Sequence, residues 1–278
     1  MLNIFVCIKQ VPMVSQLPWD SKTGILKREL AQAMMDPASR RALEAALQIK
    51  EKQSAHICAI TMGPPMAEEI LHQAKALGAD EGVLLTDQRM AGADTFLTSQ
   101  ILATFIQREK SELHLVLCGS QTSDSETAQV GPQLAQDLDI PSLGYVSLVE
   151  VKEKTVRVHR HVDDFVEIME MDLPGLITID LSAYNPRYLA LEGVEQAFEN
   201  PDIRIVNAKK LGLDDNFNAL KDSPTRIIEV FSPTTQKESR VLKGSVKKIV
   251  DLLFEDYGKV ISGAMGKDLK THEHGEDQ

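Results

Sequence analysis

Short apolar segments and helical segments alternate four times within about the first 140 residues, and this alternation constrains the fold most strongly. The apolar segments lack the polar–apolar alternation of a half-exposed strand, which is typical of strands covered on both faces. These segments comprise residues 2–8, 55–62, 82–86 and 115–118. A segment with helical spacing follows each one. The pattern therefore predicts an α/β fold with a doubly wound, mostly parallel sheet.

Capping residues mark where the helices begin and end. Asp36 precedes Pro37, and proline is tolerated at a first helical position because its missing N–H would be unpaired there. Asp94 precedes a third helix in the same way, and Gly78 is expected to end the second. The turn-rich residues 14–28 predict a small excursion or hairpin.

The second half of the chain has a different pattern. Alternating residues in 145–171 predict antiparallel strands that are added to the sheet, and 176–179 predict one more strand. We expect residues 1–190 to form the α/β domain, and residues 191–266 to form an arm that packs on a partner subunit. The polar tail, residues 267–278, has the composition of a disordered segment.

Composition excludes several classes of function. The net charge of -11 argues against nucleic acid and against an anionic membrane surface. No apolar stretch reaches 18 residues, and the 3 cysteines are far apart, so we expect a cytoplasmic protein with reduced thiols. The spacing His159-x-His161-x-Asp163 is more typical of a solvated strand face than of a metal site, and we predict no metal.

The loop after the fourth apolar segment is the strongest candidate site. Residues 120–127 are small and polar, and they lie between a strand and the predicted start of a helix. Free backbone N–H groups at such a junction bind anions, although an ordinary capped loop has the same composition. The loops at the carboxyl ends of parallel strands converge, which favours a ligand there. The usual dinucleotide, P-loop and nucleophile-elbow motifs are absent, which favours a carrier whose cofactor does the chemistry.

Several blocks, in order, resemble the β subunit of electron-transfer flavoproteins over roughly residues 1 to 255. The first block, Cys7-Ile8-Lys9-Gln10-Val11-Pro12, is similar to the family's C-V-K-Q-V-P. The other blocks lie at residues 35–37, 43–47, 61–69, 78–80, 91–95, 121–132, 185–188 and 223–225. Residues 61–65 and 23–28 resemble the bifurcating branch, which uses NADH and two FAD, more than the branch that contains AMP.

The resemblance implies an adenine-nucleotide-binding type of α/β domain in a heterodimer with an α subunit. The implied function is to bind FAD, accept hydride from NADH and pass electrons, by flavin-based electron bifurcation, to the α-subunit FAD. A flavin-containing dehydrogenase and a low-potential acceptor such as ferredoxin or flavodoxin are the implied partners. The alternative is a non-bifurcating electron carrier that holds structural AMP. A third reading, from another class, is a nucleotide-sensing regulator without flavin.

The family's nucleotide site maps onto positions that suit it physically. Backbone N–H groups of residues 125–128 would hold phosphates at the start of a helix, and Gly63 lets the backbone approach a ring or ribose. The cofactor-binding residues implied are Cys7, Ile8, Lys9, Asp36, Met62, Gly63, Ser123, Asp124, Ser125, Glu126, Thr127, Ala128, Gln129, Val130 and Gly131. No side chain is assigned a catalytic role.

The resemblance also implies a docking segment for the dehydrogenase, with Tyr184, Arg187, Tyr188 and Leu191 as contacts and Leu191 as the apolar anchor. The chain departs from the family in two informative places. Ser125 replaces a glycine, so the turn should need no positive φ at that position. Glutamates replace a lysine-rich stretch after Leu191, which predicts a different acceptor because rim charges select partners.

Overall fold

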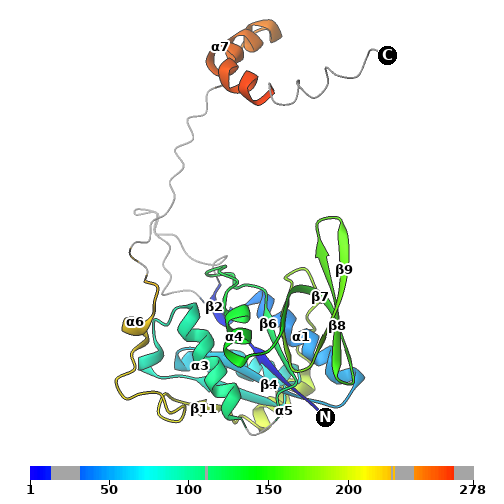
Figure 1. Cartoon of the computed structure of the whole chain (residues 1–278), viewed down its shortest axis with the longest axis vertical. Helices are drawn as coiled ribbons and strands as arrows, with labels where there is room; N and C mark the ends of the chain where they lie inside the picture. Colours follow the sequence, from blue (N-terminus) through cyan, green and yellow to red (C-terminus); the bar gives the residue numbers. More distant parts are fainter. Residues whose placement is uncertain (14–31, 110–111, 227, 229–240, 266–278) are drawn as a thin grey trace. The chain divides into compact units, whose positions relative to one another are not determined.

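The computed structural model describes residues 1–13, 32–109, 112–226, 228 and 241–265. The small excursion or hairpin predicted in residues 14–28 and the predicted tail 267–278 both lie wholly outside these ranges. The predicted α/β class with a doubly wound, mostly parallel sheet is confirmed (Figure 1).

One sheet of nine strands organises the described part of the chain, in the order β11-β5-β4-β1-β6-β10-β7-β8-β9. The strands in parallel pairings are β1 (Leu2–Cys7), β4 (Ala55–Met62), β5 (Glu81–Leu85), β6 (Leu115–Gly119), β10 (Gly175–Ile179) and β11 (Arg204–Val206). β7 (Ser142–Lys152) runs parallel to β10 and then pairs antiparallel with β8 (Thr155–Val162), which pairs with β9 (Phe165–Asp172). The antiparallel additions predicted from residues 145–171 are therefore confirmed. β2 (Gln10–Pro12) and β3 (Ala33–Met35) form a separate antiparallel pair.

Helices cover both faces of the parallel part of the sheet. α1 (Pro37–Lys52) and α2 (Glu68–Leu77) bury their apolar sides in one core, and α3 (Thr95–Arg108) and α4 (Val130–Leu138) bury theirs in the other. Short helical turns η3 (Pro65–Ala67), η4 (Gln88–Met90) and α6 (Ala219–Asp222) connect the larger elements. The two cores follow from strands whose successive side chains point to opposite faces.

The predicted capping residues occupy the helix ends. One Asp36 carboxylate oxygen accepts hydrogen bonds from the backbone N–H groups of Ala38 and Ser39, at 3.0 and 3.2 Å. Asp94 caps α3 by accepting from the Leu97 N–H at 3.0 Å. Gly78 follows α2 with a φ of 120°, a conformation that side chains disfavour. Asp36 and Asp94 therefore set the residues at which α1 and α3 begin, and Gly78 sets the residue at which α2 ends.

Residues 191–226, which follow the predicted boundary at position 190, fall in the same compact unit as the α/β core. The chain divides into one unit through Arg226 and a second unit from residue 227. α5 (Leu191–Glu199) packs on α2, and β11 pairs with β5. A few buried apolar side chains, including Val206 and Leu211, pack residues 191–226 against the core. The second unit contains the helix α7 (Val246–Met265).

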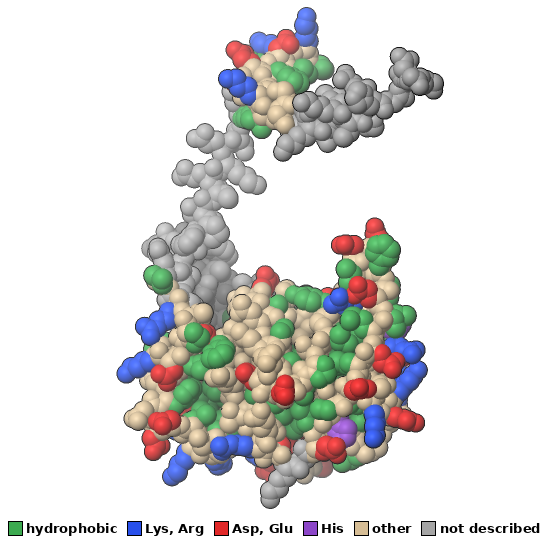
Figure 2. Space-filling view, in the orientation of Figure 1, with side chains coloured by type: hydrophobic (Ala, Val, Ile, Leu, Met, Phe, Trp, Pro, Cys, Tyr) green, Lys and Arg blue, Asp and Glu red, His purple; other side chains and the backbone are tan. Residues whose placement is uncertain are grey.

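The antiparallel strands carry an exposed apolar surface. Phe165, Val166 and Ile168 on β9 expose 73%, 54% and 62% of their surface, and Figure 2 shows hydrophobic side chains along this part of the molecule. A monomer seldom leaves a strand with so many exposed apolar side chains at the edge of a sheet. In the described ranges, no helix combines the length and the hydrophobicity that crossing a membrane requires.

Candidate functional site

The candidate site lies where the strand order reverses. β1 has β4 on one side and β6 on the other, and α1 and α4 cover opposite faces of the sheet at this point. In open α/β sheets, ligands bind beyond the carboxyl ends of strands at such a switch point. Here these ends carry the residues after β1, the start of α1 and the loop after β6 (Figure 1).

An ion pair joins the two strand ends across the switch point. Lys9 Nζ lies 2.8 Å from both carboxylate oxygens of Asp124. Partial burial would raise the pKa of Asp124, but hydrogen bonds from Lys9 and neighbouring hydroxyls outweigh burial and hold that pKa below its ordinary value. The Lys9 ammonium thus lies in the candidate site with its charge partly balanced by the protein.

Asp36 connects the loop after β6 to the start of α1. Its Oδ1 accepts from the Ser123 N–H at 2.8 Å and from the Ser123 hydroxyl at 2.9 Å, while Oδ2 caps α1. The Asp36 side chain belongs to a residue that is only 1% exposed. The Asp36 carboxylate accepts four hydrogen bonds, so its acceptor positions are occupied. Its role is therefore to position the loop.

The loop of residues 122–129 has an unusual backbone. Glu126 and Ala128 have φ values of 49° and 55°, whereas Ser125 is not among the described residues with positive φ, as its identity predicts. α4 begins at Val130, so residues 125–128 precede the helix and do not form its first turn. The Glu126 N–H donates to the Thr122 carbonyl at 2.9 Å, so this predicted phosphate donor already has a partner within the loop.

The remaining N–H groups of this loop are better placed for an anion. Among the described residues, those of Ser125, Thr127 and Ala128 donate to no protein group, and Ser125 and Thr127 are exposed. Alternating conformations of this kind turn successive N–H groups toward one concavity. Three of the four N–H groups that were predicted to hold phosphates therefore have no protein acceptor in the described structure.

Two glycines let helices approach the sheet at the site. A Cβ on Gly131 would lie 2.6 Å from Thr178 Cγ2, and a Cβ on Gly119 would lie 2.7 Å from Ala38 Cβ. Both distances are far below van der Waals contact. Gly131 is one of the predicted cofactor-binding residues. Its lack of a side chain also lets α4 pack closely on β10.

The other predicted residues surround the same strand ends. Ile8, just after β1, donates its N–H to the Ile60 carbonyl of β4, and Gly63, just after β4, donates to the Leu85 carbonyl at the end of β5. Gln129, at the other side, accepts a hydrogen bond from the Thr95 hydroxyl at 2.9 Å. Hydrogen bonding to Cys118 and burial raise the pKa of the Cys7 thiol, so Cys7 is not suited to act as a nucleophile.

One anchor beside the site was not predicted. Asp94 Oδ2 accepts from the Thr225 N–H and hydroxyl at 3.0 and 2.8 Å, and the Ser223 hydroxyl accepts from the Asp94 N–H at 3.0 Å. These bonds fix the end of the first unit beside the start of α3. The sequence signal for this anchor is the pair of family-like blocks at 91–95 and 223–225.

The four predicted docking residues separate into two pairs. Tyr184 is half-buried and its hydroxyl accepts from the Val149 N–H at 2.9 Å, and Arg187 forms ion pairs with α1. Tyr188 and Leu191 are 93% and 71% exposed. Of the four, Tyr188 and Leu191 therefore expose most of their surface to a possible partner.

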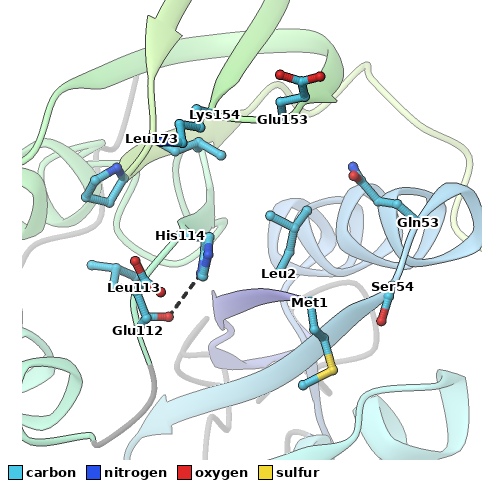
Figure 3. A pocket seen from close by; sticks show the side chains of 11 residues that line it. Met1, Leu2, Gln53, Ser54, Glu112, Leu113, His114, Glu153, Lys154 and Leu173 are labelled. Atoms are coloured by element: carbon cyan, nitrogen blue, oxygen red, sulfur yellow. Dashed lines mark hydrogen bonds between the residues drawn. The ribbon is translucent and has the colours of Figure 1, made fainter.

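A hollow of about 580 Å³ lies at the opposite edge of the sheet. Figure 3 shows Leu2, Ser54 and His114 around it, and each stands at or just before the amino end of a strand. The His114 Nδ1 lies 3.1 Å from the Glu112 carbonyl. Since ligands of such sheets bind at carboxyl ends, this hollow does not compete with the switch point as the candidate site.

Comparison with known proteins gives consistent matches. Residues 23–210 match the family model described as the electron transfer flavoprotein domain. The chain is 39% identical over 254 residues to the electron transfer flavoprotein subunit beta of Thermoanaerobacterium thermosaccharolyticum, covering 91% of this chain and 97% of the relative. It is 40% identical over 245 residues to the caffeyl-CoA reductase-Etf complex subunit CarD of Acetobacterium woodii, covering 88% and 93%. It is 36% identical over 259 residues to the acryloyl-CoA reductase electron transfer subunit gamma of Anaerotignum propionicum, covering 91% and 97%.

Proposed function

The chain belongs to the electron transfer flavoprotein family as a β subunit, and from this premise we propose that it binds FAD at the β1–β6 switch point. In this proposal it accepts hydride from NADH and passes electrons within a heterodimer with an α subunit. The proposed acceptors are a flavin-containing dehydrogenase and, through electron bifurcation, a low-potential protein such as ferredoxin or flavodoxin. FAD supplies the hydride-accepting ring, and the chain supplies binding and orientation.

The observation that carries the proposal is the loop of residues 122–129. The N–H groups of Ser125, Thr127 and Ala128 have no protein partner in the described structure, and the Thr127 hydroxyl lies in the same loop. The Lys9 ammonium reaches Asp124 of this loop. These groups fit a phosphate, because N–H donors and a cation stabilise negative charge while small side chains leave room.

Each residue then has a defined part. Asp36 holds the loop in place through Ser123, and Lys9 can move from Asp124 to a phosphate oxygen. Gly63 leaves the end of β4 without a side chain where a ring or ribose would approach. The proposal assigns these residues no catalytic acid or base role and leaves the redox chemistry to the cofactor.

The names of the relatives support the proposed partners. CarD is named as a subunit of a caffeyl-CoA reductase-Etf complex, and the Anaerotignum propionicum protein as a subunit of an acryloyl-CoA reductase. Reductases of CoA thioesters are the partners to test first. Glu192, Glu195 and Glu199 are exposed on α5, so we expect an acceptor with a basic docking face.

The same loop would hold the phosphate of AMP, which makes a non-bifurcating carrier the alternative. Cofactor extraction separates the two. The chain should be co-expressed with its α subunit, purified and denatured, and the released nucleotides quantified by chromatography. Two FAD per heterodimer support the proposal, and one FAD with one AMP supports the alternative. Absence of flavin would favour a nucleotide-sensing regulator.

A further inference from the structure

All three guanidinium nitrogens of Arg187 pair with carboxylates of α1. Nε and Nη2 lie 2.9 Å from the two carboxylate oxygens of Glu44, and Nη1 lies 2.8 Å from Glu51 Oε1. Glu44 and Glu51 both belong to α1. This two-point pairing with Glu44 is the strongest geometry available to an arginine and a carboxylate.

The backbone of Arg187 is held by the same helix. Its N–H donates to Glu44 Oε2 at 3.1 Å, and its carbonyl accepts from Arg40 Nη2 at 3.0 Å. Glu44 is only 4% exposed, and burial would raise its pKa, but hydrogen bonds from Arg187 and Gln48 outweigh burial and lower it. Residue 187 is therefore fixed to α1 through both its main chain and its side chain.

The residues that follow are presented outward. Tyr188 is 93% exposed, Leu189 is 42% exposed, and Leu191, the first residue of α5, is 71% exposed. We propose that Arg187 is a positioning residue, which holds the exposed segment 188–191 in one conformation for a protein partner without contacting that partner itself. This inference rests on the proposed function, because it assumes that the segment docks an electron acceptor. Ordering a segment in advance lowers the entropy cost of binding.

Hydrogen exchange of the heterodimer tests this role. We compare the wild type with Arg187→Met, which keeps an unbranched apolar stem and removes every side-chain donor. The matched control is Arg157→Met, which removes the exposed pair between Arg157 and Glu170 on the β8–β9 strands. Exchange in peptides covering 186–192 should rise about tenfold in Arg187→Met, since local opening governs protection. Exchange in α1 and in the central strands should stay as in the wild type, and Arg157→Met should leave 186–192 unchanged.

A conservative variant makes the test specific. Arg187→Lys keeps one ion pair but loses the two-point pairing, so exchange in 186–192 should fall between the wild type and Arg187→Met. Unchanged exchange in Arg187→Met, or a rise spread over the whole first unit, would overturn the proposal. Nucleotide content is measured on the same samples. Loss of flavin from the wild type would reject the proposed function, whereas the exchange comparison decides the role of Arg187 independently.

Discussion

Asp36 binds Ser123 with one carboxylate oxygen and the start of α1 with the other, at distances of 2.8 to 3.2 Å. The buried carboxylate therefore couples a helix to the loop that follows another strand, 87 residues away. Correct folding of α1 and correct placement of the candidate phosphate loop depend on the same side chain.

Replacing Asp36 with Ala should destabilise the first unit by about 2 to 3 kcal/mol, since it removes a helix cap and leaves buried donors without an acceptor. Urea unfolding measures the change. Asp172→Ala, at the exposed end of β9, is the control and should shift stability by less than about 0.5 kcal/mol. Equal effects of the two substitutions would mean that Asp36 does not hold the loop.

Replacing Lys9 with Met should weaken nucleotide binding by about tenfold, because a charge-assisted hydrogen bond to phosphate is lost at a partly exposed site. Calorimetry with FAD and with AMP measures the affinities. Lys154→Met is the control, because Lys154 lies beside the hollow at the opposite edge of the sheet. The account predicts no change for this control. If Lys9→Met bound both nucleotides as tightly as the wild type, Lys9 would have no phosphate contact.

Replacing Gly131 with Ala should destabilise the first unit by about 1 to 3 kcal/mol, because the new methyl group would overlap with Thr178. Thermal unfolding of the first unit is the measurement. Gly263→Ala in α7 provides a matched control, since a Cβ there meets nothing within 4 Å. That control should be neutral or slightly stabilising for its own helix. A fully stable Gly131→Ala protein would show that α4 does not need this close contact.

Asp87 should make stability depend on pH in the acid range. Hydrogen bonds from Arg89, aided by the Ala208 N–H, lower its pKa from 3.8 to about 2. A carboxylate with a lowered pKa stabilises the fold above the unfolded value of 3.8, and this contribution is lost as the pH falls towards 2. The stability difference between the wild type and Asp87→Asn should therefore be larger at pH 5 than at pH 2.5. A difference that stays constant between these values would contradict the assignment.

Leu191 should affect acceptor binding more than turnover. Leu191→Ala removes an apolar side chain that is 71% exposed, so KM for the partner dehydrogenase should rise several-fold with kcat nearly unchanged. Steady-state reduction of the dehydrogenase measures both constants. Leu220→Ala, at another exposed leucine, serves as the control. Equal KM values for wild type and Leu191→Ala would remove Leu191 from the docking surface.

The parallel sheet and its helices were predictable because their signals are local. The apolar residues 55–62 correspond to β4, and Asp36 and Asp94 cap the helices that they were expected to begin. The turn at Glu126 was not predictable in detail, because positive φ occurs at Glu126 and Ala128, whose residue types seldom adopt it. Sequence pattern locates a strand end and a helix, but the conformation between them depends on contacts such as the one from Asp36.

Contacts between distant residues explain the remaining differences. Arg187 and Glu44 are 143 residues apart, and no local pattern in the sequence indicates that they pair. Residues 191–226 were expected to belong to an arm because polar residues dominate them. A few buried side chains, such as Val206 and Leu211, instead join them to the α/β unit. Such sparse apolar anchors carry no periodicity that a sequence pattern could detect.

Anaerobic titration of the purified heterodimer with NADH tests the central claim most directly. The absorbance of the bound flavin is followed during the titration, and each FAD accepts two electrons from one NADH. The account predicts bleaching of both flavins, in a preparation that contains two FAD per heterodimer. A heterodimer that contains AMP in this chain, and whose single flavin is not reduced by NADH, would contradict it.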